Sequence, residues 1–355
     1  MKRIHRFSSS LLETIKKENK IVFYCQTYYH IFLAVLIILS IKRKEKCCIV
    51  ICPHRKPIDS IQNYLWIYKK LQQEGFICFL NDKLGIMLRL IGVSNIKNNI
   101  FFLKVKRVFL KKEKKYALVN FSWNRQVVMY PASIFFKHAE TAYFVEEGAT
   151  QYVTPMDNKF HVLMLKIYGN QVEWWKIDKL KKVYVQKPWK YDDYLRNKME
   201  QFRIDELYKN LTEKDKNMII NTFLSDYEKQ EVNKLMIIQE KIVIFTQPIS
   251  TEDGGALSTK RKYEIYNDIC SFYGQYGKVF LKIHPRDSGE YNIKGVEIIK
   301  GKYPSEIWKI LGIEFKAAVG LCTGAIENVD AKKKCNLNEQ FLYDNTYQLI
   351  EINEM

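Results

Sequence analysis

The chain has 355 residues, of which 47% are hydrophobic and 14% aromatic. This length suits two domains with large apolar cores, and the composition excludes an intrinsically disordered protein. Lysine and arginine number 57 against 39 acidic residues, and the net charge of +18 favours an anionic partner such as a nucleic acid, an anionic lipid or a phosphorylated substrate. Because the lysines are spread along the whole chain, a general lysine-rich surface explains the charge equally well.

The beginning of the chain predicts no membrane-spanning segment. Residues 1–19 form a basic lead-in without the apolar core of a signal peptide. The apolar run 31–41 is too short to cross a bilayer, so it predicts a buried helix. The eight cysteines include no C-x-x-C pair, which argues against a zinc site. We therefore expect a cytoplasmic chain with reduced thiols.

Short apolar runs alternate with helical patterns in the first half of the chain, which is typical of βαβ units and a parallel sheet. Strands are predicted at 21–25, 48–52, 76–80, 100–103, 117–121, 142–145 and 183–186. Helices are predicted at 30–40, 57–71 and near 127–137.

A second series of the same kind follows a charged stretch. It has strands at 242–245, 279–283, 296–299 and 317–321, with helices at 263–273 and 304–311. We predict an α/β protein of two Rossmann-like, doubly wound domains that face a central cleft. The N-terminal domain, on the acceptor side, would cover 1–190, the linker 191–240 and the C-terminal, donor-side domain 241–355.

Polar residues follow the predicted strands of the first domain, where ligands of parallel sheets bind. Thr27 follows the first strand, and the pair Glu146-Glu147, with Gly148, follows strand 142–145. Successive side chains of a strand point to opposite faces, so one of the two glutamates would face the cleft. There it could act as a general base. A solvated acidic turn is the alternative explanation.

Polar residues also follow the strands of the second domain. Gln247 and the run Glu252-Asp253-Gly254-Gly255 follow the first of these strands, Lys282, His284, Pro285 and Arg286 lie at the end of the second, and Thr323-Gly324 follows strand 317–321. An imidazole can bind or protonate a departing phosphate, a guanidinium can bind it in bidentate fashion, and a hydroxyl with free amides can cradle it. A flexible surface loop and a histidine bound only to backbone are the alternatives.

Several common nucleotide-binding and catalytic motifs are absent. The chain has no G-x-x-x-x-G-K-[ST], no G-x-G-x-x-G and no G-x-S-x-G sequence. It also contains no D-x-D pair, which argues against a metal-dependent nucleotide-sugar enzyme of the single-domain type.

Taken in order, these motifs resemble those of bacterial sialyltransferases, most closely glycosyltransferase family 52, with kinship to the polysialyltransferases. Those families share a D/E-D/E-G motif and a later His-Pro motif, matched here by Glu146-Glu147-Gly148 and His284-Pro285. The opening IVFYCQTYYHIFLAVLI and the phrase IFTQP also look like the family's domain starts, so the resemblance covers about residues 20–325. It implies a GT-B fold, inverting transfer from CMP-sialic acid and no required metal or other cofactor.

The resemblance also implies roles for single residues. His284 would bind the CMP phosphate beside the amide of Arg286, whereas Pro285 at the same place has no N–H to offer. Thr323 would take the place of a phosphate-binding hydroxyl that is more often serine. For the general base, related families point to the early motif, Glu146 or Glu147, and family 52 points to Asp253. Both assignments stay open. Further candidates for donor binding are Thr27, Gln247, Gly254 and Lys282.

The expected reaction transfers sialic acid to a terminal galactose-type acceptor of a bacterial surface glycan, in a capsule or a lipooligosaccharide. The expected partners are a nucleotide-sugar donor and a glycan acceptor, which includes lipid-linked acceptors, and no nucleic acid. The positive charge is compatible with peripheral binding to the anionic inner face of the cell membrane, and a homodimer is also compatible with the sequence. One alternative is a transferase that uses another nucleotide sugar, such as a UDP-hexose. Another is a non-catalytic basic protein that binds nucleic acid or membranes.

Overall fold

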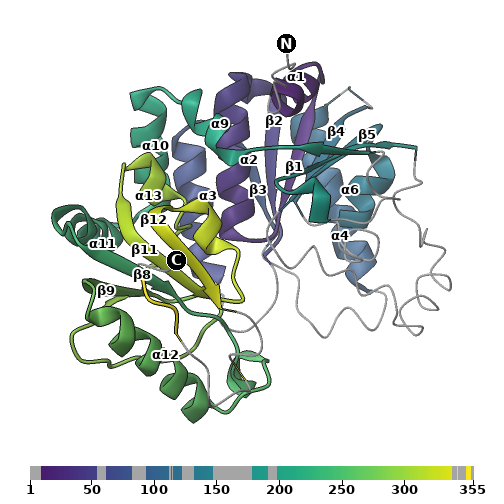
Figure 1. The fold of residues 1–355 in the computed structure, drawn as a ribbon. Coiled ribbons are helices and arrows are strands. Elements are labelled where there is room, and N and C mark those ends of the chain that lie inside the picture. Colours follow the sequence, from purple (N-terminus) through teal and green to yellow (C-terminus); the bar gives the residue numbers. More distant parts are fainter. Residues whose placement is uncertain are drawn as a thin grey trace. The chain divides into compact units, whose positions relative to one another are not determined.

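The computed structural model describes residues 9–53, 61–81, 93–111, 113, 115–121, 132–146, 178–190, 198–337, 342 and 349–352. The chain divides into two compact units whose main boundary lies between Thr222 and Phe223. In the part of the chain that is described, each unit contains one parallel β-sheet, as Figure 1 shows.

The sheet of the first unit has seven strands in the order β3-β2-β1-β4-β5-β6-β7. They are β1 (Ile21–Cys25), β2 (Cys47–Ile51), β3 (Ile77–Leu80), β4 (Ala117–Asn120), β5 (Thr141–Val145), β6 (Leu180–Val185) and β7 (Met199–Gln201). Every pair of neighbours is parallel. The order of the strands reverses between β1 and β4, so this is the point at which a doubly wound sheet binds its ligand.

Helices lie on both faces of this sheet (Figure 1). The helices between Ser9 and Phe223 are α1 (Ser9–Lys16), α2 (Tyr28–Ile41), η1 (Lys44–Lys46), α3 (Ile61–Gln73), α4 (Val93–Val105), η3 (Lys106–Leu110), α6 (Ala132–His138), η6 (Pro188–Lys190), α9 (Ile204–Lys209) and α10 (Glu213–Phe223). Figure 1 shows α2 and α3 on one face and α4 and α6 on the other. Val22 and Tyr24 of β1 belong to the same buried core as Phe102 of α4 and Phe135 of α6.

Helix α2 confirms the buried helix expected after the first strand. Thr27 caps its beginning, because its Oγ1 accepts a hydrogen bond from the backbone N–H of His30 at 3.2 Å. Lys42, in the left-handed conformation with φ of 54°, ends it. Within the described residues, no helix is both long and apolar enough to cross a membrane.

The strand predicted at 100–103 is wrong, because these residues belong to α4. Phe102 and Val105 are buried, whereas Ile100 is 61% exposed and Leu103 57% exposed. The two buried residues are three positions apart, which is the spacing of one face of a helix, and a four-residue apolar run cannot by itself distinguish a helix from a strand. The expected lead-in contains α1, and the stretch assigned to the linker contributes β7, which pairs with β6.

The sheet of the second unit has five strands in the order β10-β9-β8-β11-β12. They are β8 (Lys241–Phe245), β9 (Lys278–Lys282), β10 (Glu297–Ile299), β11 (Glu314–Leu321) and β12 (Asp330–Leu337), and the helices are α11 (Asp226–Ile237), η7 (Thr251–Asp253), α12 (Thr259–Gly274), α13 (Ile307–Ile310) and η8 (Ala325–Asn328). All neighbours are parallel, and the order reverses at β8 and β11. This repeats the arrangement of the first unit, so the prediction of two Rossmann-like sheets is confirmed.

Candidate functional site

Three loops meet at the carboxyl edge of the sheet in the second unit. Phe245 at the end of β8 is paired with Lys282 of β9 on one side and with Gly320 of β11 on the other. The residues that follow these strands, among them Thr246 and His284, therefore lie along one edge, at the point where the strand order reverses. In a doubly wound sheet this is the edge at which ligands bind.

The side chain of Thr246 and the backbone of Arg286 hold His284 in place. Its N–H donates to Oγ1 of Thr246 at 2.9 Å, and its Nδ1 accepts a hydrogen bond from the N–H of Arg286 at 3.1 Å. Because Nδ1 accepts, the neutral ring carries its proton on Nε2, which is a hydrogen-bond donor. Burial, and then the charge of Arg286, lowers the pKa of His284 to about 4. The ring is thus neutral near pH 7 and presents one N–H.

Asp253 is a buried carboxylate whose oxygens are fully engaged within the second unit. Its Oδ2 accepts from Ser250 Oγ at 2.7 Å and from Lys262 Nζ at 2.8 Å. Its Oδ1 accepts from the N–H of Ser288 at 2.9 Å and from Ser288 Oγ at 2.7 Å. Burial acts to raise the pKa of Asp253, but these hydrogen bonds, led by that from Lys262, hold it well below its usual value.

Lys262 also binds a second carboxylate. Its Nζ lies 2.9 Å from Oδ1 of Asp287, and the side chains of Lys262, Asp253 and Asp287 are each 0% exposed. Burial acts to lower the pKa of Lys262, yet the two carboxylates raise it above its usual value. Neither Lys262 nor Asp287 is among the site residues predicted from the sequence.

Lys282 is bound to the loop after β10. Its Nζ donates to the carbonyl of Gly301 and lies 4.4 Å from the ring centroid of Tyr303. Burial lowers the pKa of Lys282 to about 8. The same loop is held from α11, where Glu231 accepts the backbone N–H groups of Lys300 at 2.9 Å and Gly301 at 3.1 Å.

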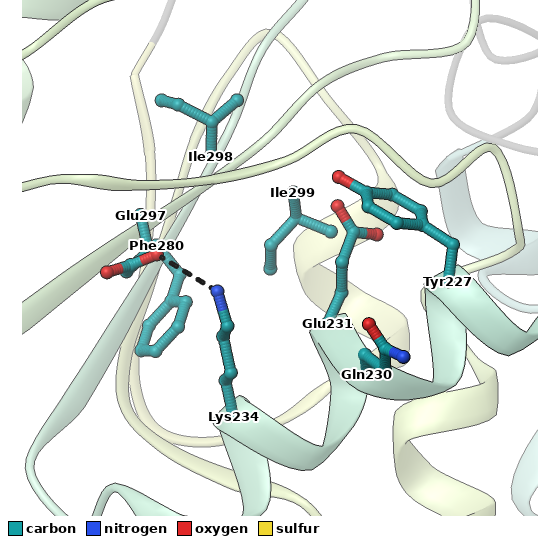
Figure 2. A pocket seen from close by; sticks show the side chains of 8 residues that line it. All are labelled: Tyr227, Gln230, Glu231, Lys234, Phe280, Glu297, Ile298 and Ile299. Atoms are coloured by element: carbon teal, nitrogen blue, oxygen red, sulfur yellow. Dashed lines mark ion pairs between the residues drawn. The ribbon is translucent and has the colours of Figure 1, made fainter.

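A pocket lies next to this loop, between α11 and the sheet (Figure 2). It is lined by Tyr227, Gln230, Glu231 and Lys234 of α11, Phe280 of β9, and Glu297, Ile298 and Ile299 of β10. None of the site residues predicted from the sequence lines it. Figure 2 shows the ion pair between Lys234 and Glu297, whose nearest atoms are 3.9 Å apart.

The other predicted residues of the second unit have structural contacts of their own. Thr323 is buried, its Oγ1 accepts from the N–H of Ala325 at 3.2 Å, and its own N–H donates to Asn336 at 3.1 Å. Gly254 ends η7 with φ of 84°, which favours glycine. The N–H of Gln247 donates to the hydroxyl oxygen of Tyr266 at 2.7 Å.

The first unit brings its predicted residues to the carboxyl edge of its own sheet. Thr27 follows β1 and caps α2. Glu146 follows β5, is buried, and accepts the N–H of Gln186 at 2.7 Å through Oε2. The carboxylate of Glu146 therefore points into the protein and binds backbone. Glu147 and Gly148 lie outside the described residues.

Similarity to known proteins agrees with this arrangement. The model of glycosyltransferase family 52 matches residues 63–337. An uncharacterized protein of Haemophilus influenzae is 25% identical over 281 residues, which cover 74% of this chain and 85% of that protein.

Two solved structures show the same fold. The α/β-galactoside α-2,3-sialyltransferase of Photobacterium phosphoreum is 13% identical, with a TM-score of 0.53 and coverage of 89% of both chains. The 2,6-sialyltransferase of Photobacterium sp. JT-ISH-224, solved with CMP and lactose, is 12% identical, with a TM-score of 0.55 and coverage of 89% of this chain and 71% of that one. With the family model matched over most of its length and a Rossmann-like sheet in each unit, the chain belongs to glycosyltransferase family 52 and has the GT-B fold.

Proposed function

We propose that this glycosyltransferase is an inverting sialyltransferase that moves sialic acid from CMP-sialic acid to a terminal galactose-type acceptor of a bacterial surface glycan. The observation that carries the proposal is the fixed Nε2–H of His284 at the carboxyl edge of the second sheet. A structural neighbour that was solved with CMP and lactose supports both the donor and the type of acceptor.

The chemistry is a single displacement. The acceptor hydroxyl oxygen attacks the anomeric carbon of sialic acid, the bond from this carbon to the phosphate oxygen breaks, and CMP leaves with the electron pair of that bond. In this proposal His284 donates its Nε2–H to the phosphate, where negative charge grows in the transition state. Arg286, which is exposed, and Thr323 are proposed to bind the same phosphate.

A carboxylate takes the proton of the acceptor hydroxyl in this reaction. Asp253 and Glu147 are the two candidates for this base. Glu146 is a weaker candidate than Glu147, because its carboxylate binds the backbone of Gln186. The two candidates are distinguished by CMP binding. Loss of a base impairs transfer and leaves CMP affinity unchanged, whereas loss of a group that shapes the phosphate site weakens CMP binding.

The test is incubation with CMP-sialic acid, other CMP-linked acids and UDP-hexoses, with and without EDTA, while the release of free nucleotide is measured. We expect turnover of CMP-sialic acid that EDTA does not abolish. Turnover of a UDP-hexose alone would favour the alternative transferase. Salt-sensitive binding of nucleic acid without any turnover would favour a non-catalytic basic protein.

We also propose that the enzyme binds an anionic membrane surface from the cytoplasmic side, where lipid-linked acceptors lie. The surface of α4 and η3 supports this, because exposed Ile100, Leu103 and Val108 lie beside exposed Lys104 and Arg107. Binding to vesicles rich in phosphatidylserine should weaken as salt rises, and an absence of binding at low salt would contradict the proposed membrane association.

A homodimer stays a prediction, which sedimentation equilibrium tests.

A further inference from the structure

Three buried ionised groups lie together beneath the loop that carries His284. Lys262, in the first turns of α12, has its Nζ 2.8 Å from Asp253 and 2.9 Å from Asp287. The two carboxylates come from different parts of the sheet edge, since Asp253 follows β8 and Asp287 follows β9. One lysine therefore ties two loops to the beginning of one helix.

Burying three charged groups contributes little net free energy to the stability of a fold. Removing charged groups from water costs several kcal/mol per ion, and apolar side chains of the same volume often stabilise a protein as well or better. The beginning of a helix also disfavours a cation, because the helix dipole places positive charge there. A requirement for defined geometry explains the three charges better than a requirement for stability does.

The geometry that the cluster defines is that of the His284 loop. The N–H of Asp287 donates to the carbonyl of His284 at 2.8 Å, and Asp253 accepts both hydrogen bonds of Ser288. Asp287 also accepts from the N–H of Gly289 at 2.9 Å. Gly289 has no room for a side chain, because a Cβ there would lie 2.9 Å from Oδ1 of Asp287 and 3.1 Å from Nζ of Lys262.

We infer that Lys262 is a positioning residue, which acts through Asp253 and Asp287 to hold His284 at the phosphate site, and that Asp253 belongs to this cluster and is not the general base. An ionised carboxylate offers about four lone-pair sites, and Asp253 uses four of them for hydrogen bonds inside the protein. A base needs a site that faces the acceptor hydroxyl. The inference rests on the proposed function for the role of His284 itself.

The test compares Lys262→Met, Asp253→Asn and Asp287→Asn with the control Lys260→Met. Lys260 stands two positions earlier on the same helix, and its side chain is 88% exposed. The first readout is the pKa of His284, followed by NMR of its ring and assigned with the spectrum of His284→Ala. The second is CMP affinity, measured by calorimetry, and thermal melting reports whether each variant folds.

In the wild type and in Lys260→Met we expect the pKa of His284 to be about 4. In the three cluster variants a released loop exposes the ring, so its pKa should rise towards the usual value of about 6.5. CMP affinity should fall about tenfold to a hundredfold, because a misplaced His284 loses a hydrogen bond to a charged phosphate. If Lys262→Met does not fold, Ser288→Ala removes one hydrogen bond from Asp253 and should shift both readouts in the same direction by less.

Two results would overturn the inference. One is a folded Lys262→Met protein whose His284 titrates as in the wild type. The other is an Asp253→Asn protein that loses transfer and keeps its CMP affinity, because this is the behaviour of a base. If the wild type neither binds CMP nor turns over CMP-sialic acid, the proposed function fails, while the titration of His284 still tests the positioning by Lys262.

Discussion

In the proposed reaction, Nε2 is the atom of His284 that acts on the leaving phosphate. His284→Asn leaves a polar atom close to the position of Nδ1, where Arg286 donates its N–H, and removes the donor at Nε2. One preorganised donor aimed at developing charge is worth about 3 kcal/mol, which is about a hundredfold in rate. We therefore expect kcat for transfer and for donor hydrolysis to fall by about this factor, together with a weaker affinity for CMP.

His284→Gln is the matched variant, because its longer side chain carries an N–H close to the position of Nε2. It should retain more activity than His284→Asn if hydrogen-bond donation is the role of the residue. The assay is the rate of CMP release from CMP-sialic acid with and without a lactose acceptor, together with the Kd of CMP. Full activity and unchanged CMP affinity in His284→Asn would refute the phosphate assignment, and equal loss in both variants would show that donation from Nε2 is not what matters.

The remaining predictions test protonation, the base and the fold. The neutral ring of His284 is the proposed donor, and its pKa is about 4, so the active form increases as pH rises through that value. His284 should therefore impose no loss of kcat/KM between about pH 5.5 and 8. A fall in activity above about pH 6.5 that His284→Gln removes would instead indicate an imidazolium acid. Glu147→Ala should lower transfer by about a hundredfold or more without weakening CMP binding, and full transfer in this variant would return the role of base to Asp253. Thr27→Ala removes the cap of α2 and should lower the free energy of unfolding by about 1 kcal/mol, which urea denaturation measures, whereas an unchanged value would show that the cap adds no stability.

The sequence by itself determined most strands of the two sheets and the loops that carry the chemistry. Buried parallel strands are short apolar runs bounded by polar residues, so β1, β8 and β9 stand out in the printed sequence, and the residues after them are the ones at the sheet edge. The strand predicted at 100–103 was wrong, because four residues are too few to distinguish a strand from one face of a helix. The strand β12 was not predicted, since three consecutive lysines interrupt the apolar pattern of this edge strand.

Only the tertiary structure decided which charged side chains belong together. Lys262 stands in the polar run TKRKYE, where nothing distinguishes it from the exposed Lys260, and its two carboxylate partners are 9 and 25 positions away. The partners of Lys282, which are Gly301 and Tyr303, could not be predicted from the sequence either. A strand pattern indicates on which face of the sheet a side chain lies, but not which residue it contacts. Periodicity is a local property that the sequence displays, whereas a buried ion pair depends on how distant segments pack, and this is why the fold was predictable and the surroundings of Asp253 were not.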